Sequence, residues 1–196
     1  MAGKQAKILS ESQQKKVLAY INNFTRYPLR NRAMFLLSVK AGLRAVEISK
    51  LRWSHVTDAE GNLADEITFE DRASKGGNGG RTIPINKHLL EALVKLHEQT
   101  PHGPHQPVIQ TEREKSGVSR QVIVNQFARW FKGVGLEGCS SHSGRRTFIT
   151  NAARKISTVG GSLKDVQSLA GHSSLQTTQR YIEVNSEARK RIVQLV

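Results

Sequence analysis

Tyrosine, histidine and arginine side chains occur in the last third of the chain at spacings that suit phosphate chemistry. Tyr181 follows His172 within the stretch LAGHSSLQTTQRY. Upstream, HSGRRT places His142 three residues before Arg145, so both side chains project from one face of a helix. Attack on a phosphodiester requires a nucleophile, groups that transfer protons and positive charge around the phosphate oxygens. These residues therefore point to phosphodiester chemistry on nucleic acid.

Two positions nearer the N-terminus could serve the same chemistry. Arg44 and Glu47 lie three residues apart, a spacing at which the carboxylate can orient the guanidinium for bidentate contact with phosphate. Lys75 precedes the run GGNGG, so a hairpin tip could carry its ammonium group into a groove and donate a proton. Taken singly, these features also fit structural roles: a half-buried tyrosine, a solvated HxxR helix, a surface ion pair and a solubilising hairpin lysine.

The overall charge narrows the class of partner. The 196 residues include 30 Lys and Arg against 16 Asp and Glu, a net charge of +14 that favours a polyanion such as nucleic acid. The N-terminus lacks the apolar core of a signal peptide, and no apolar run approaches about 20 residues. We therefore expect a cytoplasmic, nucleoid-associated protein with no membrane partner. Cys139 is the only cysteine, which excludes an internal disulfide and a cysteine-based metal cage.

The order of elements predicts a mainly α fold with a small antiparallel β hairpin. Ser10 and Gln13 form a capping-box pattern ahead of apolar residues at helical spacing, and Gly42 suits a helix end. Alternating residues on both sides of GGNGG predict two strands, and Pro84 indicates an edge strand. We expect helices from Ser10, over 29–39, 44–51, 87–98 and 119–133, and from near His142, Ser162, Ser174 and Ser186, with strands over 66–70 and 81–85.

Five motifs occur in one chain order: AGLRAVEI around Arg44, SKGG around Lys75 followed by RTIPI, HSGRRT from His142, LAGH ending at His172, and TTQRY ending at Tyr181. Together they resemble the catalytic domain of the tyrosine recombinases, also called the phage integrase family. The resemblance spans nearly the whole chain. One position departs from the family pattern: Gly144 stands where a leucine is usual, which removes an apolar anchor from the start of that helix.

The resemblance implies a covalent mechanism of DNA cleavage and rejoining. Tyr181 would attack the scissile phosphate, form a 3′-phosphotyrosyl link and free a 5′-hydroxyl. Arg44 and Arg145 match the two arginines that hold the phosphate oxygens in this family. The covalent link conserves the energy of the phosphodiester, so neither a metal nor another cofactor is implied.

Four further residues match family positions with supporting roles. Lys75 corresponds to the hairpin lysine that protonates the departing 5′ oxygen. His142 corresponds to the histidine that assists proton transfer from the nucleophile, and His172 to the one that donates a hydrogen bond to the phosphate. Glu47 matches an acidic position behind the first arginine.

The same resemblance implies domain limits and partners. We expect a basic leader over 1–9, a catalytic domain over 10–185 and a C-terminal tail helix over 186–196, without an N-terminal core-binding domain. The expected partners are double-stranded DNA, three further copies in a homotetramer on DNA, and accessory DNA-bending proteins. Two alternatives stay open: a type IB topoisomerase-like nicking and closing enzyme, and a catalytically silent or accessory DNA-binding protein derived from an integrase.

Overall fold

The computed structural model describes residues 6–69, 80–99, 103–112, 116–181 and 193–194. Within these ranges the chain is mostly α-helical with one two-stranded antiparallel sheet, which confirms the predicted fold class. Lys75 lies outside the described residues, as does most of the predicted tail helix. None of the helices in the described ranges has the length and apolar character needed to cross a bilayer.

The helices and strands begin and end close to the positions predicted from capping and turn residues. Ser119, Ser162 and Ser174 each cap the helix that follows them. The elements are α1 Glu11–Phe24, α2 Pro28–Ala41, α3 Ala45–Lys50, η1 Trp53–His55, β1 Glu66–Phe69, β2 Arg81–Pro84, α4 Lys87–Gln99, α5 Arg120–Gly133, α6 Ser141–Lys155, η3 Ile156–Val159, α7 Leu163–Ala170 and α8 Leu175–Gln179.

The first helix begins at the predicted capping box. The Gln13 backbone N–H donates to the Ser10 hydroxyl at 3.2 Å, and the Ser10 N–H donates to the Gln13 side-chain oxygen at 2.9 Å. Just before this helix, the Leu9 N–H donates to the Thr147 hydroxyl of α6 at 2.8 Å. The start of α1 is therefore fixed against the helix that carries the HxxR motif.

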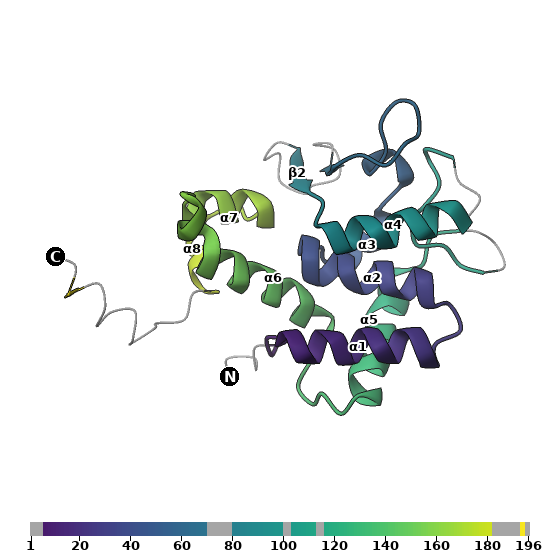
Figure 1. Cartoon of the computed structure of the whole chain (residues 1–196), viewed down its shortest axis with the longest axis horizontal. Coiled ribbons are helices and arrows are strands. Elements are labelled where there is room, and N and C mark those ends of the chain that lie inside the picture. Colours follow the sequence, from purple (N-terminus) through teal and green to yellow (C-terminus); the bar gives the residue numbers. More distant parts are fainter. Residues whose placement is uncertain (1–5, 70–79, 100–102, 113–115, 182–192, 195–196) are drawn as a thin grey trace.

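Helix α2 lies at the centre of the fold and contacts α1, α3, α4 and α6 (Figure 1). From Ala33 to Ala41 its apolar residues are buried on every face, as expected for a helix that is surrounded by others. Pro28 occupies its first turn, and Gly42 ends it in the left-handed conformation at φ 67°. The chain turns at once into α3, so Arg44 emerges beside the C-terminal end of the core helix.

The hairpin pairs β1 with β2 in antiparallel register, with Ile67 opposite Ile83 and Phe69 opposite Arg81. Ile67 and Ile83 are both buried. Since side chains alternate between the two faces of a strand, Phe69 and Arg81 share the inner face with these isoleucines. An arginine thus points toward the protein interior from the first residue of β2.

Helix α6 leads from the main body to α7 and α8, which lie at one end of the molecule (Figure 1). A second, smaller core forms there from Ile149, Val166 and Ala170, and Tyr181 packs against it. The start of α6 is held by a close approach to α2. A Cβ atom added at Gly144 would lie 2.2 Å from the Ser38 Oγ atom and 2.9 Å from its Cβ atom. Gly144 therefore replaces an apolar anchor with direct helix-to-helix contact.

Candidate active site

The first charged pair lies at the junction between α2 and α3. Arg44 is the N-cap residue of α3, and its backbone N–H donates to Glu47 Oε2 at 2.7 Å. Its side-chain Nη1 atom lies 3.1 Å from Glu47 Oε1. Glu47 therefore holds both the backbone and the guanidinium of Arg44, the orientation that the i, i+3 spacing predicts.

Arg145 is buried and bound to backbone carbonyls. Its side chain is 5% exposed, and it donates at 2.7 Å to the Gly42 carbonyl and at 2.7 Å to the Ala170 carbonyl. These carbonyls belong to the C-terminal ends of α2 and α7. Burial and, to a smaller extent, the nearby positive charge of Arg44 together lower the pKa of Arg145 to about 10, so the group stays protonated at neutral pH. Arg145 thus joins two helix ends and keeps its charge.

Arg81 is a third arginine of the site, and the sequence did not single it out. Its Nη2 atom lies 3.1 Å from Glu47 Oε1, and its Nη1 atom donates to the Ala170 carbonyl at 2.6 Å. Burial lowers its pKa, and the charge of Glu47 opposes that shift. From sequence, Arg81 was assigned no individual role beyond its place in the predicted strand RTIPI. The strand alternation that places it on the same face as buried Ile83 was the signal that could have found it.

His172 follows Gly171, which ends α7 in the left-handed conformation at φ 60°. The imidazole is 8% exposed, and its Nδ1 atom lies 3.0 Å from the Thr178 hydroxyl. Burial, followed by the positive charges of Arg145 and the other two arginines, lowers the pKa of His172 to about 4. His172 is therefore neutral at physiological pH. Thr178 is a second residue that sequence reasoning missed, because a threonine inside a short helix carries no distinctive signal.

Tyr181 lies beside His172, with ring centroids 5.5 Å apart and planes inclined by 24°. A helix that begins near Ser174 was predicted, and the expectation that it extends as far as Tyr181 is wrong. Helix α8 ends at Gln179, and Tyr181 sits in the turn that follows. The Thr150 hydroxyl donates to the Tyr181 carbonyl at 3.3 Å. The charge of Tyr181 also raises the pKa of Arg145, so the proposed nucleophile lies near this arginine.

His142 lies in the first turn of α6 and is exposed. Within the described part of the chain, its ring makes no hydrogen bond to the arginines, to His172 or to Tyr181. Of the seven residues that the sequence proposed, the structure therefore brings five together, leaves His142 exposed without a hydrogen bond to them, and does not describe Lys75. The five are Arg44, Glu47, Arg145, His172 and Tyr181.

The cluster carries more positive than negative charge. Arg44, Arg81 and Arg145 are cationic, Glu47 is the carboxylate that neutralises part of this charge, and His172 is neutral. Such a site suits an anion with several oxygens, because guanidinium groups bind phosphate through paired N–H donors. Among the described residues, no group of three His, Cys, Asp or Glu side chains could hold a metal ion.

Residues 7–188 match the sequence profile of the Phage integrase family, which covers most of the chain. The chain belongs to the phage integrase family. The tyrosine recombinase XerA of Pyrococcus horikoshii is 28% identical to this integrase-family chain over 186 residues, with 92% of the chain aligned. The chain spans 58% of the length of that relative.

Solved structures have the same fold as this phage integrase family member. The Tn1549 transposon integrase in complex with a circular intermediate DNA aligns with a TM-score of 0.75 at 16% identity, covering 100% of this chain and 67% of that one. A XerA recombinase crystal structure aligns with a TM-score of 0.69 at 20% identity, covering 96% and 64%. These relatives are recombinases and an integrase, so they give no support to the topoisomerase-like and silent alternatives.

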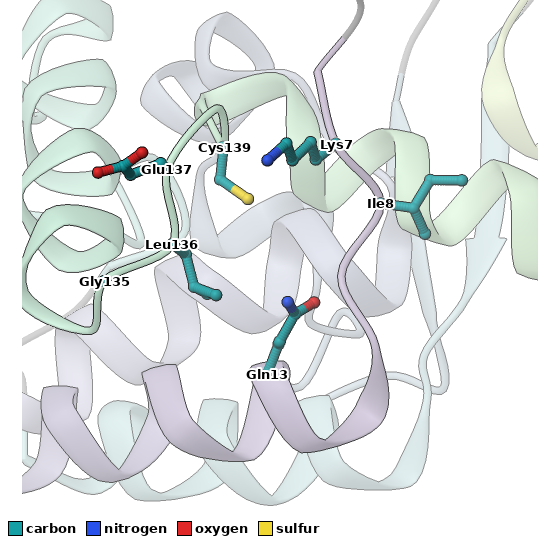
Figure 2. Close-up of a pocket in the computed structure, with 7 residues that line it drawn as sticks. All are labelled: Lys7, Ile8, Gln13, Gly135, Leu136, Glu137 and Cys139. Carbon is teal, nitrogen blue, oxygen red and sulfur yellow. The ribbon is translucent and has the colours of Figure 1, made fainter.

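A separate hollow of about 240 Å³ lies between the segment just before α1 and the connection from α5 to α6 (Figure 2). It shares no residue with the arginine cluster. It is lined by Lys7, Ile8, Gln13, Gly135, Leu136, Glu137 and Cys139.

Proposed function

We propose that this chain is a site-specific DNA recombinase that cleaves and rejoins DNA through a covalent link to Tyr181. One observation carries the proposal: three arginines, a neutral histidine and a tyrosine from separate parts of the chain converge on one site. Membership of the phage integrase family supports the same conclusion.

The first chemical step is an in-line exchange at phosphorus. The Tyr181 hydroxyl oxygen forms a bond to the scissile phosphorus, and the bond from phosphorus to the 5′ oxygen breaks. The tyrosine proton leaves toward His142 or solvent, and Lys75 supplies a proton to the departing 5′ oxygen. The reverse attack by a 5′-hydroxyl reseals the strand, so the reaction needs no external energy source.

The remaining residues stabilise the charge that develops on phosphorus. Arg44 and Arg145 bind the non-bridging oxygens, and His172 donates a hydrogen bond to one of them. Glu47 orients Arg44 through the two contacts described above. The excess positive charge of the cluster also stabilises the negative charge that develops on the phosphate oxygens in the transition state.

The substrate we propose is double-stranded DNA, held chiefly through its phosphates. The net charge of +14 supports this choice and predicts binding that weakens steeply with salt. Strand exchange uses two duplexes and four nucleophiles, so we assign a homotetramer on DNA, assisted by DNA-bending proteins and located at the nucleoid in the cytoplasm. Within the chain we assign residues 10–185 to the catalytic domain, 1–9 to a leader and 186–196 to a tail helix.

Covalent trapping tests the proposal directly. The substrates are duplexes of randomised sequence that carry a nick near each candidate phosphate. After attack by the tyrosine, the short strand between the cleavage site and the nick dissociates, so the covalent link cannot be resealed. We expect a protein–DNA adduct on a denaturing gel with the full chain, and a phosphotyrosine at Tyr181 by mass spectrometry of the digested adduct.

Two phenylalanine substitutions provide the control. Tyr181→Phe should abolish the adduct, whereas Tyr20→Phe, which removes a hydroxyl from α1, should leave it intact. An adduct that persists in Tyr181→Phe would refute the assignment of the nucleophile. Salt-dependent DNA binding with no adduct from the wild-type chain would instead favour the silent DNA-binding alternative.

A further inference from the structure

Thr178 links the candidate phosphate-binding histidine to the candidate nucleophile. Its side chain is fully buried in α8, and its hydroxyl lies 3.0 Å from Nδ1 of His172. Its backbone carbonyl accepts the Tyr181 N–H at 3.0 Å. Gln167 fixes the same histidine from the other side, because its side-chain amide donates to the His172 carbonyl at 2.9 Å. His172 is thus held at its ring and at its backbone.

The hydrogen bond between Thr178 and His172 determines which ring nitrogen carries the proton. Within the described part of the chain, Nδ1 of His172 is the only hydrogen-bond partner of the Thr178 hydroxyl. If Nδ1 were protonated, it would donate to the hydroxyl oxygen, and the hydroxyl proton would be buried without an acceptor. Buried donors without acceptors are rare because they are costly. The hydroxyl therefore donates to Nδ1, and the proton of the neutral ring resides on Nε2.

We propose that Thr178 is a positioning residue that holds His172 as the Nε2–H tautomer, so that the neutral imidazole can donate a hydrogen bond to a phosphate oxygen. The expected effect of Thr178 on catalysis rests on the proposed function. The tautomer decides whether the interaction between Nε2 and a phosphate oxygen is attractive or repulsive. An Nε2–H group attracts the oxygen, whereas an Nε2 lone pair would repel it. The low pKa of His172, about 4, agrees with a ring that stays neutral while it does so.

Two substitutions at adjacent threonines separate this role from general packing. Thr178→Val keeps the β-branched shape and removes the hydroxyl that contacts Nδ1. Thr177→Val is the matched control, because the Thr177 hydroxyl lies 3.1 Å from that of Ser174 and does not contact His172. Thr178→Ser retains a hydroxyl and should restore the wild-type behaviour.

The first readout is the tautomer itself. Long-range ¹H–¹⁵N correlation spectra of the full chain, labelled with ¹⁵N-histidine, distinguish Nδ1–H from Nε2–H, and the signals of His172 are those that vanish in His172→Gln. We expect Nε2–H in the wild type, in Thr177→Val and in Thr178→Ser, and a mixture or Nδ1–H in Thr178→Val. An Nδ1–H wild type would overturn the proposal, and this result does not require any catalytic activity.

The second readout is the rate of adduct formation on the nicked duplexes. Loss of one oxyanion donor typically lowers a rate by about 10²–10³-fold, so a disturbed tautomer in Thr178→Val should lower it by about 10- to 100-fold. Thr178→Ser and Thr177→Val should stay within a few-fold of wild type. An unchanged rate and tautomer in Thr178→Val would refute the role. If the wild type forms no adduct, the proposed function is refuted, but the spectra still show which ring nitrogen of His172 carries the proton. If Thr178→Val does not fold, the spectra of the wild type and of Thr178→Ser decide the tautomer instead.

Discussion

Replacing Gly144 with alanine should force α6 away from α2. The new Cβ atom would lie 2.9 Å from Ser38 Cβ and 3.1 Å from a methyl carbon of Val39. Favourable carbon contacts lie at about 3.5–4.0 Å, so the helices must separate by roughly 0.6–1.1 Å. Ser38 and Val39 are buried in the central helix and cannot turn aside into solvent.

Two opposing effects set the cost in stability. Overpacking a core costs about 1–3 kcal/mol, whereas alanine in place of glycine inside a helix returns about 1 kcal/mol. Gly144→Ala should therefore lower the free energy of unfolding by about 0–2 kcal/mol. The catalytic cost should be larger, because Arg145 is the next residue and donates to carbonyls on two other helices. A displacement of about 1 Å can cost about 10²-fold in rate.

Urea unfolding and the rate of adduct formation would measure the two effects separately. Gly103→Ala is the matched control, because among the described residues no atom beyond the chain neighbours lies within 4 Å of a Cβ added there. Ser38→Gly should partly restore both quantities in the Gly144→Ala background, since it removes the Oγ and Cβ atoms of Ser38 but leaves the Val39 methyl group in place. Wild-type stability together with a wild-type rate in Gly144→Ala would show that α6 does not depend on this close approach.

Two further predictions concern charge in the site. Glu47→Gln should lower the rate of adduct formation by about 10- to 100-fold, because Arg44 and Arg81 lose the carboxylate that orients them. DNA affinity in a filter-binding assay should stay equal or rise, because both arginines keep their charge. A large loss of affinity would contradict this prediction. Burial holds the pKa of His172 at about 4, below its unfolded value near 6.5. Between these pH values the unfolded chain binds more protons than the folded chain. His172 therefore contributes on the order of 2–3 kcal/mol to the free energy of unfolding above about pH 6.5, and this contribution is lost as the pH falls toward 4. Urea unfolding at pH 5 and pH 7 should show this dependence in the wild type and a smaller one in His172→Gln.

The elements could be predicted from sequence because their boundaries are set by local chemistry. Ser10 with Gln13, Gly42, and the serines before later helices each satisfy or end backbone hydrogen bonds within a few residues. The hairpin likewise follows from alternation on either side of its glycines. The exact end of α8 did not follow, since a helix of this length gains little from its own residues and its end depends on tertiary contacts such as that from Thr150 to Tyr181.

The side-chain partners of the site could be predicted only where they lie close together in the chain. Arg44 and Glu47 form the pair that their spacing predicts. Strand alternation can show that Arg81 points inward, but its contacts with Glu47 and with the end of α7 join segments that are far apart in sequence, so no local pattern identifies these partners. The role of Gly144 was also hidden, because the sequence shows a missing side chain but not the neighbouring helix that occupies its space.

The way the arginines are held explains how the site can be rigid and still attract an anion. Arg145 is fixed by the neutral carbonyls of Gly42 and Ala170, so its position is set without any loss of its charge. Arg44 and Arg81 share the single carboxylate of Glu47, so one negative charge balances only part of their combined positive charge. A second carboxylate would orient the arginines equally well but would repel a phosphate. Backbone carbonyls at helix ends provide the same orientation and leave the positive charge to the substrate, which is the arrangement that phosphoryl transfer requires.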